Sequence, residues 1–176
     1  MDRIKFFALS GSLREASYNL AALKALAKNS PDHIDIVIGD ISQLPLFNPD
    51  LESEFIPALD KIKSEIKSSS GLIISSPEYA HGISAPMKNV LDWLVSSSEF
   101  TEIPIMLINT SPRATHALAS LKEVLTTMSG IIIDAAYVSI PLLGSVLLDG
   151  DISQDNECHS MLSEGLDRFY SEVTKT

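Results

Sequence analysis

The sequence predicts an α/β fold in three layers, a five-stranded parallel sheet covered by helices on both faces, from two observations. Short apolar runs alternate along the chain with longer segments whose apolar residues recur every three or four positions. The runs are typical of strands buried on both faces, and the longer segments are typical of amphipathic helices. This alternation indicates βαβ units and therefore a parallel sheet. The chain has 176 residues, and we expect residues 1–176 to form a single domain.

The strands are predicted from apolar runs that are too short for helices. The first is a nearly continuous run with one lysine, and a Ser-Gly-Ser turn follows it. A proline at position 77 stops the third. The fifth is predicted in two pieces. The segments are 4–9, 34–38, 71–75, 103–108, and 131–133 with 137–138.

The helices are predicted from apolar spacing and from their start signals. Ser17 is a good N-cap for the first helix, and Pro86 suits the first turn of the third. A long loop from Gly39 to Phe55 precedes the second, and long loops in compact domains are often functional. The predicted helices are 18–28, 56–68, one starting near Pro86, 115–128 and 152–173.

The composition excludes several classes of protein. A net charge of −10 argues against a nucleic-acid partner, which requires a basic stripe. No apolar run approaches the roughly 20 residues that cross a bilayer, and residues 1–3 lead straight into a predicted strand. We therefore expect a cytoplasmic protein without membrane contact. The single cysteine, Cys158, allows no intrachain disulfide and no zinc cluster, so we interpret it as a neutral or buried thiol.

The functional site is expected at one edge of the sheet. In open α/β sheets, ligands bind beyond the carboxyl ends of the strands, where the strand order reverses. Strand ends of this kind are followed by loops, and these are the segments in which we look for function. The predicted loops are 10–17, 76–86 and 109–115.

The first loop has the features of a phosphate site. A Ser-Gly-Ser turn opens a helix, and the free N–H groups of a helix start attract a phosphate. The hydroxyls of Ser12 and Ser17, the charge of Arg14 and the amide of Asn19 can add to such a site. Neither the P-loop nor the dinucleotide glycine pattern is present, which favours a terminal phosphate monoester. An ordinary capped turn with a surface arginine is the alternative.

The second loop suits a flat polar ring. Its backbone N–H groups can face the edge of such a ring, and Gly82 allows a close approach. Tyr79 and His81 can flank the ring. A plain turn whose side chains shield the end of the sheet explains the segment equally well.

Together these loops carry two motifs in the expected order. Gly11–Asn19 has the form G-S-L-R-x-x-S-x-N, and P-E-Y is followed by S-x-P-x-K-N-x-x-D-W at Ser84–Trp93. With these motifs, and with LPLFNPD at Leu44–Asp50, the chain resembles the NAD(P)H-dependent FMN reductases of flavodoxin-like fold. That family includes azo-dye, chromate and quinone reductases. The likeness extends from Ile4 to about Met128 and implies the strand order 2-1-3-4-5.

The resemblance also implies a site and a chemistry. It implies FMN as cofactor, NADPH or NADH as co-substrate, a small-molecule acceptor such as a quinone, azo compound or free flavin, and ping-pong transfer without a catalytic side chain. At the phosphate it implies Ser12, Arg14, Ser17 and Asn19. At the isoalloxazine it implies Pro77, Glu78, Tyr79, Ala80, His81 and Gly82, with Ser111 of the third loop near the flavin.

Such enzymes form homodimers or homotetramers, and the helix that carries Trp93 often takes part in the interface. A core position for Trp93 is equally open. The chain departs from the family at Ala80, where asparagine is common, and in its third loop, which lacks the usual pair of glycines. In that loop Arg113 and His116 are expected to narrow or recharge the site and to affect access of the nicotinamide.

Three other functions fit parts of the sequence. A flavodoxin-like electron carrier, or a flavin-binding regulatory protein with little turnover, agrees with the acidic charge. A hydrolase with Ser12 as nucleophile would require a histidine held by a carboxylate, and no motif pairs His81 or His116 with an aspartate. A fold that has lost its cofactor is supported only by the missing glycines of the third loop.

Overall fold

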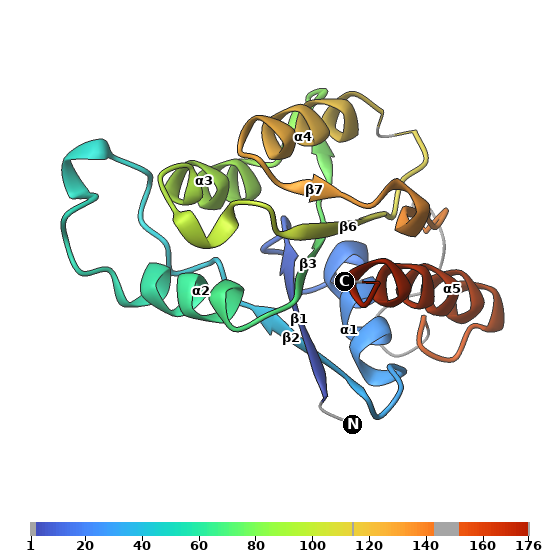
Figure 1. Cartoon of the computed structure of the whole chain (residues 1–176). Coiled ribbons are helices and arrows are strands. Elements are labelled where there is room, and N and C mark those ends of the chain that lie inside the picture. The colour runs from blue at the N-terminus through green and yellow to red at the C-terminus, as the bar shows by residue number, and fades with distance from the viewer. Residues whose placement is uncertain (1–2, 114, 143–151, 176) are drawn as a thin grey trace.

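A central parallel sheet organises the molecule (Figure 1). The computed structural model describes residues 3–113, 115–142 and 152–175. In the sheet the strands follow the order β2-β1-β3-β6-β7, and β8 pairs with β6 beyond β7. This confirms the predicted order 2-1-3-4-5, with β6 as the fourth strand. The strands are β1 Ile4–Ser10, β2 Ile34–Gly39, β3 Gly71–Ser75, β6 Pro104–Asn109, β7 Ile131–Ile132 and β8 Val138–Ser139.

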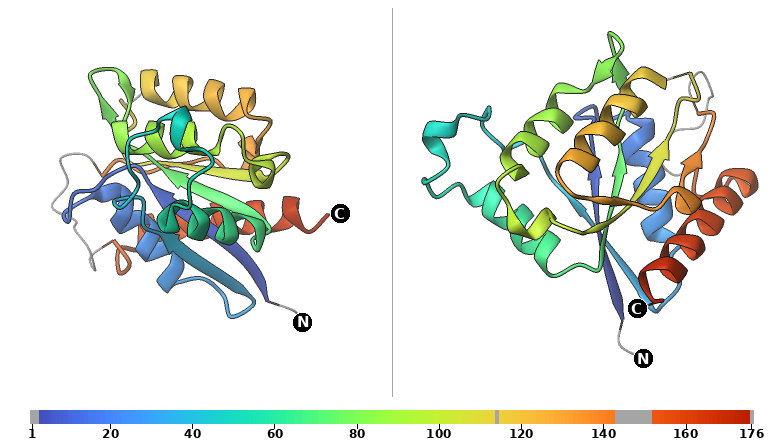
Figure 2. Two further views of the ribbon diagram at one scale, coloured as in Figure 1. Left: turned by 90° about the vertical axis from the view of Figure 1, so that its left-hand side faces the viewer. Right: turned by 45° about the horizontal axis from the view of Figure 1, so that its top comes forward.

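Helices cover both faces of this sheet (Figures 1 and 2). One face carries α1 and α5, and the other carries α2, α3 and α4. The three-layer arrangement is therefore confirmed. The helices are α1 Tyr18–Lys28, α2 Pro57–Lys67, α3 Ala85–Leu94, α4 Thr115–Thr127 and α5 Asn156–Val173, and short 3-10 turns lie at η1 Pro49–Leu51, η2 Ser98–Phe100 and η3 Asp134–Ala136.

Two hydrophobic cores result from the alternation of side chains along each strand. In β1, Phe6 and Ala8 point into the core under α1 and α5, whereas Phe7 and Leu9 point into the core under α2, α3 and α4. The ring of Phe6 packs against that of Phe169 with centroids 4.7 Å apart. Burying an aromatic side chain of this size contributes about 1.5–3 kcal/mol. Because a strand such as β1 is buried on both faces, most of its residues are apolar, and its sequence is a nearly continuous apolar run.

Side chains that cap the first turn determine where two of the helices begin. Ser17 caps α1 by accepting from the Leu20 N–H, as predicted. Asp155 caps α5 in the same way through Cys158, so α5 starts at Asn156 and not at position 152. Among the described residues, no helix has the length and apolar character needed to cross a membrane.

The last strand and the second loop differ from the prediction in detail. Between β7 and β8 the chain forms η3, whose Ala136 leaves the sheet and is buried among core residues that include those of α5. The fifth strand is therefore interrupted by a helical turn. After β3 a hairpin forms from β4 (Glu78–Tyr79) and β5 (Gly82–Ile83), which the sequence does not predict because each strand has only two residues.

Candidate active site

The predicted loops meet at the carboxyl ends of β1, β3 and β6. They enclose a cleft of about 170 Å³. Eight of the predicted site residues line it: Ser12, Arg14, Ser17, Asn19, Pro77, Glu78, Tyr79 and Ser111. The other lining residues, which the sequence did not single out, are Ala16, Tyr18, Ser76 and Thr110. Ser76 and Thr110 each directly follow a strand, and this position at the strand end was the available signal.

Gly11 allows the first two loops to come together. Its N–H donates to the carbonyl of Ser75 at 2.8 Å, and its carbonyl accepts from the buried hydroxyl of Ser84 at 2.6 Å. A Cβ atom on Gly11 would lie 2.3 Å from the Oγ atom of Ser76. Any other residue would therefore push the two loops apart at the base of the cleft.

The start of α1 presents hydrogen-bond donors toward the cleft. Ser12 and Ser17 are buried, and each hydroxyl oxygen already accepts a backbone N–H, from Arg14 at 3.4 Å and from Leu20 at 3.3 Å. An accepting hydroxyl still has its own proton to donate. The first turn of α1 contains no acidic residue, and the side chain of Arg14 is exposed beside it. This combination of helix dipole, hydroxyl protons and guanidinium can hold an anion.

Asn19 ties the strand ends to this helix. Its Oδ1 atom accepts from the Ser75 hydroxyl at 2.9 Å and from the Thr110 hydroxyl at 3.1 Å. All three side chains are buried. Asn19 thus joins α1 to the ends of β3 and β6, and its amide oxygen is committed to this bracing.

The β4–β5 hairpin forms one wall of the cleft. Pro77, Glu78 and Tyr79 line the cleft. Ala80, His81 and Gly82 are not among its lining residues: Ala80 and His81 form the turn of the hairpin, and Gly82 begins β5. The φ angles of Ala80 and His81 are 49° and 61°, the left-handed values of a two-residue hairpin turn. The backbone contact predicted for these three residues stays a prediction, and the structure places them at the open end of the hairpin, next to the cleft-lining Tyr79.

Glu78 connects this hairpin to α4. Its Oε2 atom accepts from the Ala117 N–H in the first turn of α4 at 2.8 Å, and its Oε1 atom lies 3.1 Å from Nδ1 of His81. The backbone N–H of Ala117 is the main cause that lowers the pKa of Glu78 below 4.5, and His81 adds to the effect. The rings of His81 and His116 meet edge to face with centroids 4.5 Å apart.

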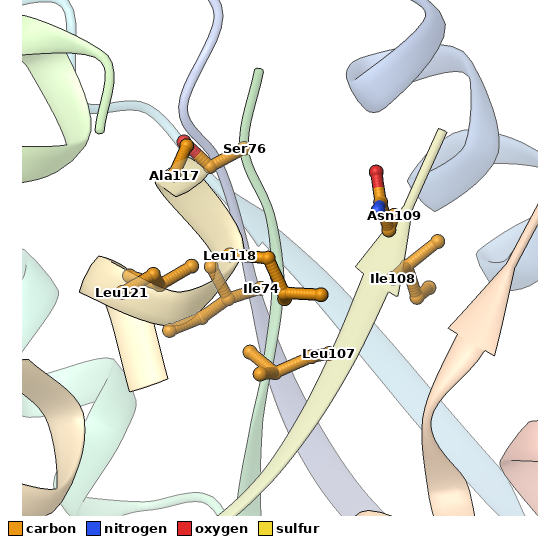
Figure 3. A pocket seen from close by; sticks show the side chains of 8 residues that line it. All are labelled: Ile74, Ser76, Leu107, Ile108, Asn109, Ala117, Leu118 and Leu121. Carbon is orange, nitrogen blue, oxygen red and sulfur yellow. The ribbon is translucent and has the colours of Figure 1, made fainter. Parts of the chain in front are cut away.

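The third loop is braced from below. The Ser111 N–H donates to the Asn109 side chain at 2.9 Å, and Asn109 in turn donates to the Tyr137 hydroxyl at 3.3 Å. Behind this loop a cavity of about 10 Å³ lies between the strand ends and α4, which is about the room that one water requires. Figure 3 shows Ser76 and Asn109 above and the apolar side chains of Leu118 and Leu121 below.

Several side chains considered for other roles have different places in the structure. His81 is paired with Glu78, and the hydrogen bonds of the described residues include none between Ser12 and His81 or His116, so the pair needed for a serine nucleophile is not formed. Trp93 is buried in the core under α3, and its Nε1–H donates to the carbonyl of Pro45 at 2.9 Å. This decides the open question on Trp93 in favour of the core. Cys158 is buried, and burial raises the pKa of its thiol to about 11.

Comparison with known proteins identifies relatives along most of the chain. Residues 4–143 match the model of a family described as NADPH-dependent FMN reductase. A quinone reductase of Pseudomonas putida is 30% identical over 173 residues, covering 93% of this chain and 91% of that protein. An NADPH azoreductase of a Bacillus strain is 28% identical and covers 86% and 88% of the two chains.

Other relatives match over a shorter stretch. An NAD(P)H-dependent FMN reductase of Pseudomonas aeruginosa is 38% identical over 93 residues, so the chain covers only 50% of that protein's length and the match covers 52% of this chain. Among solved structures, a flavoenzyme NAD(P)H:(acceptor) oxidoreductase of Paracoccus denitrificans has a TM-score of 0.80 at 24% identity, with 98% of both chains covered. This likeness shows that the fold is flavodoxin-like. The chain belongs to the NADPH-dependent FMN reductase family.

Proposed function

We propose that the protein is an NAD(P)H-dependent reductase that holds FMN without a covalent bond and reduces small acceptors such as quinones, azo compounds or free flavin. The family assignment supports the flavin and the nicotinamide. The names of the long-matching relatives, a quinone reductase and an azoreductase, support the acceptor class. FMN supplies the redox chemistry when it is bound, because it accepts a hydride from the nicotinamide and passes electrons on.

The observation that carries this proposal is the start of α1. Like α3, whose N-cap Ser84 accepts from the Met87 N–H, α1 begins with a hydroxyl cap, Ser17. At α4 the carboxylate of Glu78 already accepts from the Ala117 N–H in the first turn. The first turn of α1 has no acidic residue, and the cation Arg14 lines the same cleft as Ser17. In a chain of net charge −10, such local geometry is what can hold the FMN phosphate against the overall field.

The remaining cleft residues suit the ring of the cofactor. Pro77 and Tyr79 offer flat apolar surface, and Tyr79 is 53% exposed beside the cleft. The polar residues Glu78, Thr110 and Ser111 line the same cleft. In this proposal the side chains bind, orient and shield the ring, and none has to donate or remove a proton.

An absorbance titration with FMN tests the proposal. The purified protein should take up FMN, lose the flavin absorbance on addition of NADPH or NADH, and recover it with a quinone. Arg14→Ala should weaken FMN binding by about 10- to 100-fold, because a charged hydrogen bond to phosphate is lost. Arg168→Ala is the matched control, since Arg168 lies on α5 and pairs with Glu164.

The same titration separates the rival functions. Bound flavin that neither nicotinamide can reduce would favour an electron carrier or a flavin-binding regulatory protein. A protein that takes up no FMN would refute the flavin site altogether and would leave only the fold.

The assembly is proposed to be a homodimer formed over α3 and the loop 40–56, which precedes α2. Asn89 holds this loop on α3 by donating to the Pro45 carbonyl at 2.9 Å and accepting from the Phe47 N–H at 2.8 Å. The loop and the end of α3 expose Leu46, Phe55 and Val95, which are 83%, 79% and 63% accessible. Sedimentation should give twice the mass of the chain, and a monomer at micromolar concentration would contradict this assignment.

A further inference from the structure

The β4–β5 hairpin cannot hold its own conformation. Each of its strands has two residues, and the only register pairs are Glu78 with Ile83 and Tyr79 with Gly82. Isolated two-stranded hairpins are marginal in water. The two central turn residues, Ala80 and His81, have positive φ values although neither is glycine, asparagine or aspartate, and such values cost an alanine free energy. Something outside the hairpin must therefore stabilise it.

That support comes from α4. Figure 2 shows the hairpin beside the start of this helix. The bond from the Ala117 N–H to Glu78 joins the two elements at 2.8 Å. The edge-to-face contact of His81 with His116 joins them a second time, and Glu78 orients His81 by its bond to Nδ1. One carboxylate thus takes part in both of these connections.

Glu78 is also placed where its charge is favourable. Its side chain is 13% exposed and accepts from a helix start, where partial positive charge gathers. The first turn of α4 contains no acidic residue of its own, so the carboxylate of Glu78 supplies the missing negative charge from another element. Charged acceptors on backbone N–H groups form strong hydrogen bonds.

We propose that Glu78 is a positioning residue that latches the hairpin to α4 and thereby holds Pro77 and Tyr79 in the shape that receives the flavin ring. This role rests on the proposed function of the cleft. It is distinct from a direct flavin contact, because it acts through the bonds of the carboxylate to Ala117 and His81.

Two substitutions at Glu78 and one control test the latch. Glu78→Gln keeps an acceptor for the Ala117 N–H, whereas Glu78→Ala removes it. Asp155→Ala is the control: Asp155 accepts from the Cys158 N–H at the start of α5, also at 2.8 Å, but it does not line the cleft. The control therefore removes the same kind of helix-start bond from another part of the fold.

The readouts are FMN affinity, the absorbance spectrum of saturated FMN, and hydrogen exchange of the amides at 79–83. We expect Glu78→Ala to weaken FMN binding about tenfold, the effect of one charged hydrogen bond. It should also shift the flavin spectrum and speed exchange in the hairpin. We expect Glu78→Gln to stay within about threefold of the wild type, since the neutral bond is retained. Asp155→Ala should leave the flavin affinity and spectrum unchanged.

The outcomes distinguish the latch from the proposed function. A wild-type protein without FMN uptake refutes the function, and exchange at 79–83 then still shows whether Glu78 holds the hairpin. If the Glu78→Ala protein had the FMN affinity, flavin spectrum and hydrogen exchange of the wild type, the latch would be overturned. The proposed function would still be tested separately, by the effect of Arg14→Ala on the phosphate site. Equal losses of FMN affinity in Glu78→Ala and Asp155→Ala would also overturn it, because the effect would then be general destabilisation.

Discussion

The backbone at Ala80 gives a physical meaning to one departure from the family sequence. Where asparagine is common in the family, this chain has alanine in the left-handed region, with a φ of 49°. Left-handed backbone costs most L-residues about 1–2 kcal/mol, whereas asparagine is tolerated there. The alanine therefore adds strain to the hairpin turn.

Ala80→Asn should therefore stabilise the protein. We expect a gain of about 0.5–1 kcal/mol, which raises the melting temperature by about 1–4 °C in a chain of this size. Ala80→Val is the opposite control, because a β-branched residue is strongly disfavoured at positive φ. Thermal unfolding followed by circular dichroism measures both. If the two substitutions shifted the melting temperature in the same direction, backbone strain in the turn would not be what determines their effect on stability.

At the scale of elements, long patterns were predictable and short ones were not. Continuous apolar runs predict β1, β2, β3 and β6 to within one residue at each end. The two residues of β4 carry no periodicity, and the interruption at η3 depends on packing against α5. Tertiary contacts of this kind are invisible in a local window.

The candidate site also has a part that the sequence predicts and a part that it does not. Side chains on predicted strand-end loops, such as Ser12 and Ser111, do line the cleft. The bond from Ala117 to Glu78 and those from Ser75 and Thr110 to Asn19 could not be predicted, because each joins positions at least 39 residues apart. Their partners become neighbours only when the sheet has formed.

Gly165 allows α5 to lie close to the sheet. A Cβ atom at this position would stand 2.2 Å from Cγ2 of Val138 and 3.0 Å from Cε of Met106. Gly165→Ala stabilises the helix by about 1 kcal/mol through its higher helix propensity. Overpacking of a core costs about 1–3 kcal/mol, and because the clash here is so short we expect a cost near the upper end of that range. We expect a net loss of about 1–2 kcal/mol in urea unfolding.

Ser160→Ala is the control for this prediction, because Ser160 lies on the exposed face of the same helix and its hydroxyl bonds only to Glu164 among the described residues. It should leave stability unchanged or slightly higher. A Gly165→Ala protein as stable as Ser160→Ala would show that α5 can shift away from β8 at little cost.

At the scale of the whole molecule, the pH dependence of stability depends on carboxylates that hydrogen bonds stabilise in the ionised form. Asp40 accepts from the side chain and backbone of Ser42, Glu78 from Ala117, Glu99 from the Ser97 hydroxyl, and Asp155 from Cys158. These bonds lower the pKa of each group in the folded state below 3.8 for aspartate and 4.5 for glutamate. The unfolded chain therefore binds protons at a higher pH than the folded protein does.

The sign of the pH dependence follows from this difference. The stabilisation is complete above the unfolded pKa values and is lost as the pH falls through the lower folded values, so unfolding in urea should become easier below about pH 4.5. A second effect acts in the opposite direction: protonation first reduces the net charge of −10, which relieves the repulsion between negative charges in the folded protein.

Urea midpoints of unfolding at pH 7, 5, 4 and 3 decide between the two effects. In a protein with Glu99→Gln and Asp155→Asn, the midpoint should fall less steeply as the pH is lowered. Stability that rose steadily down to pH 3 would mean that charge repulsion, and not these hydrogen bonds, governs the acid behaviour of the fold.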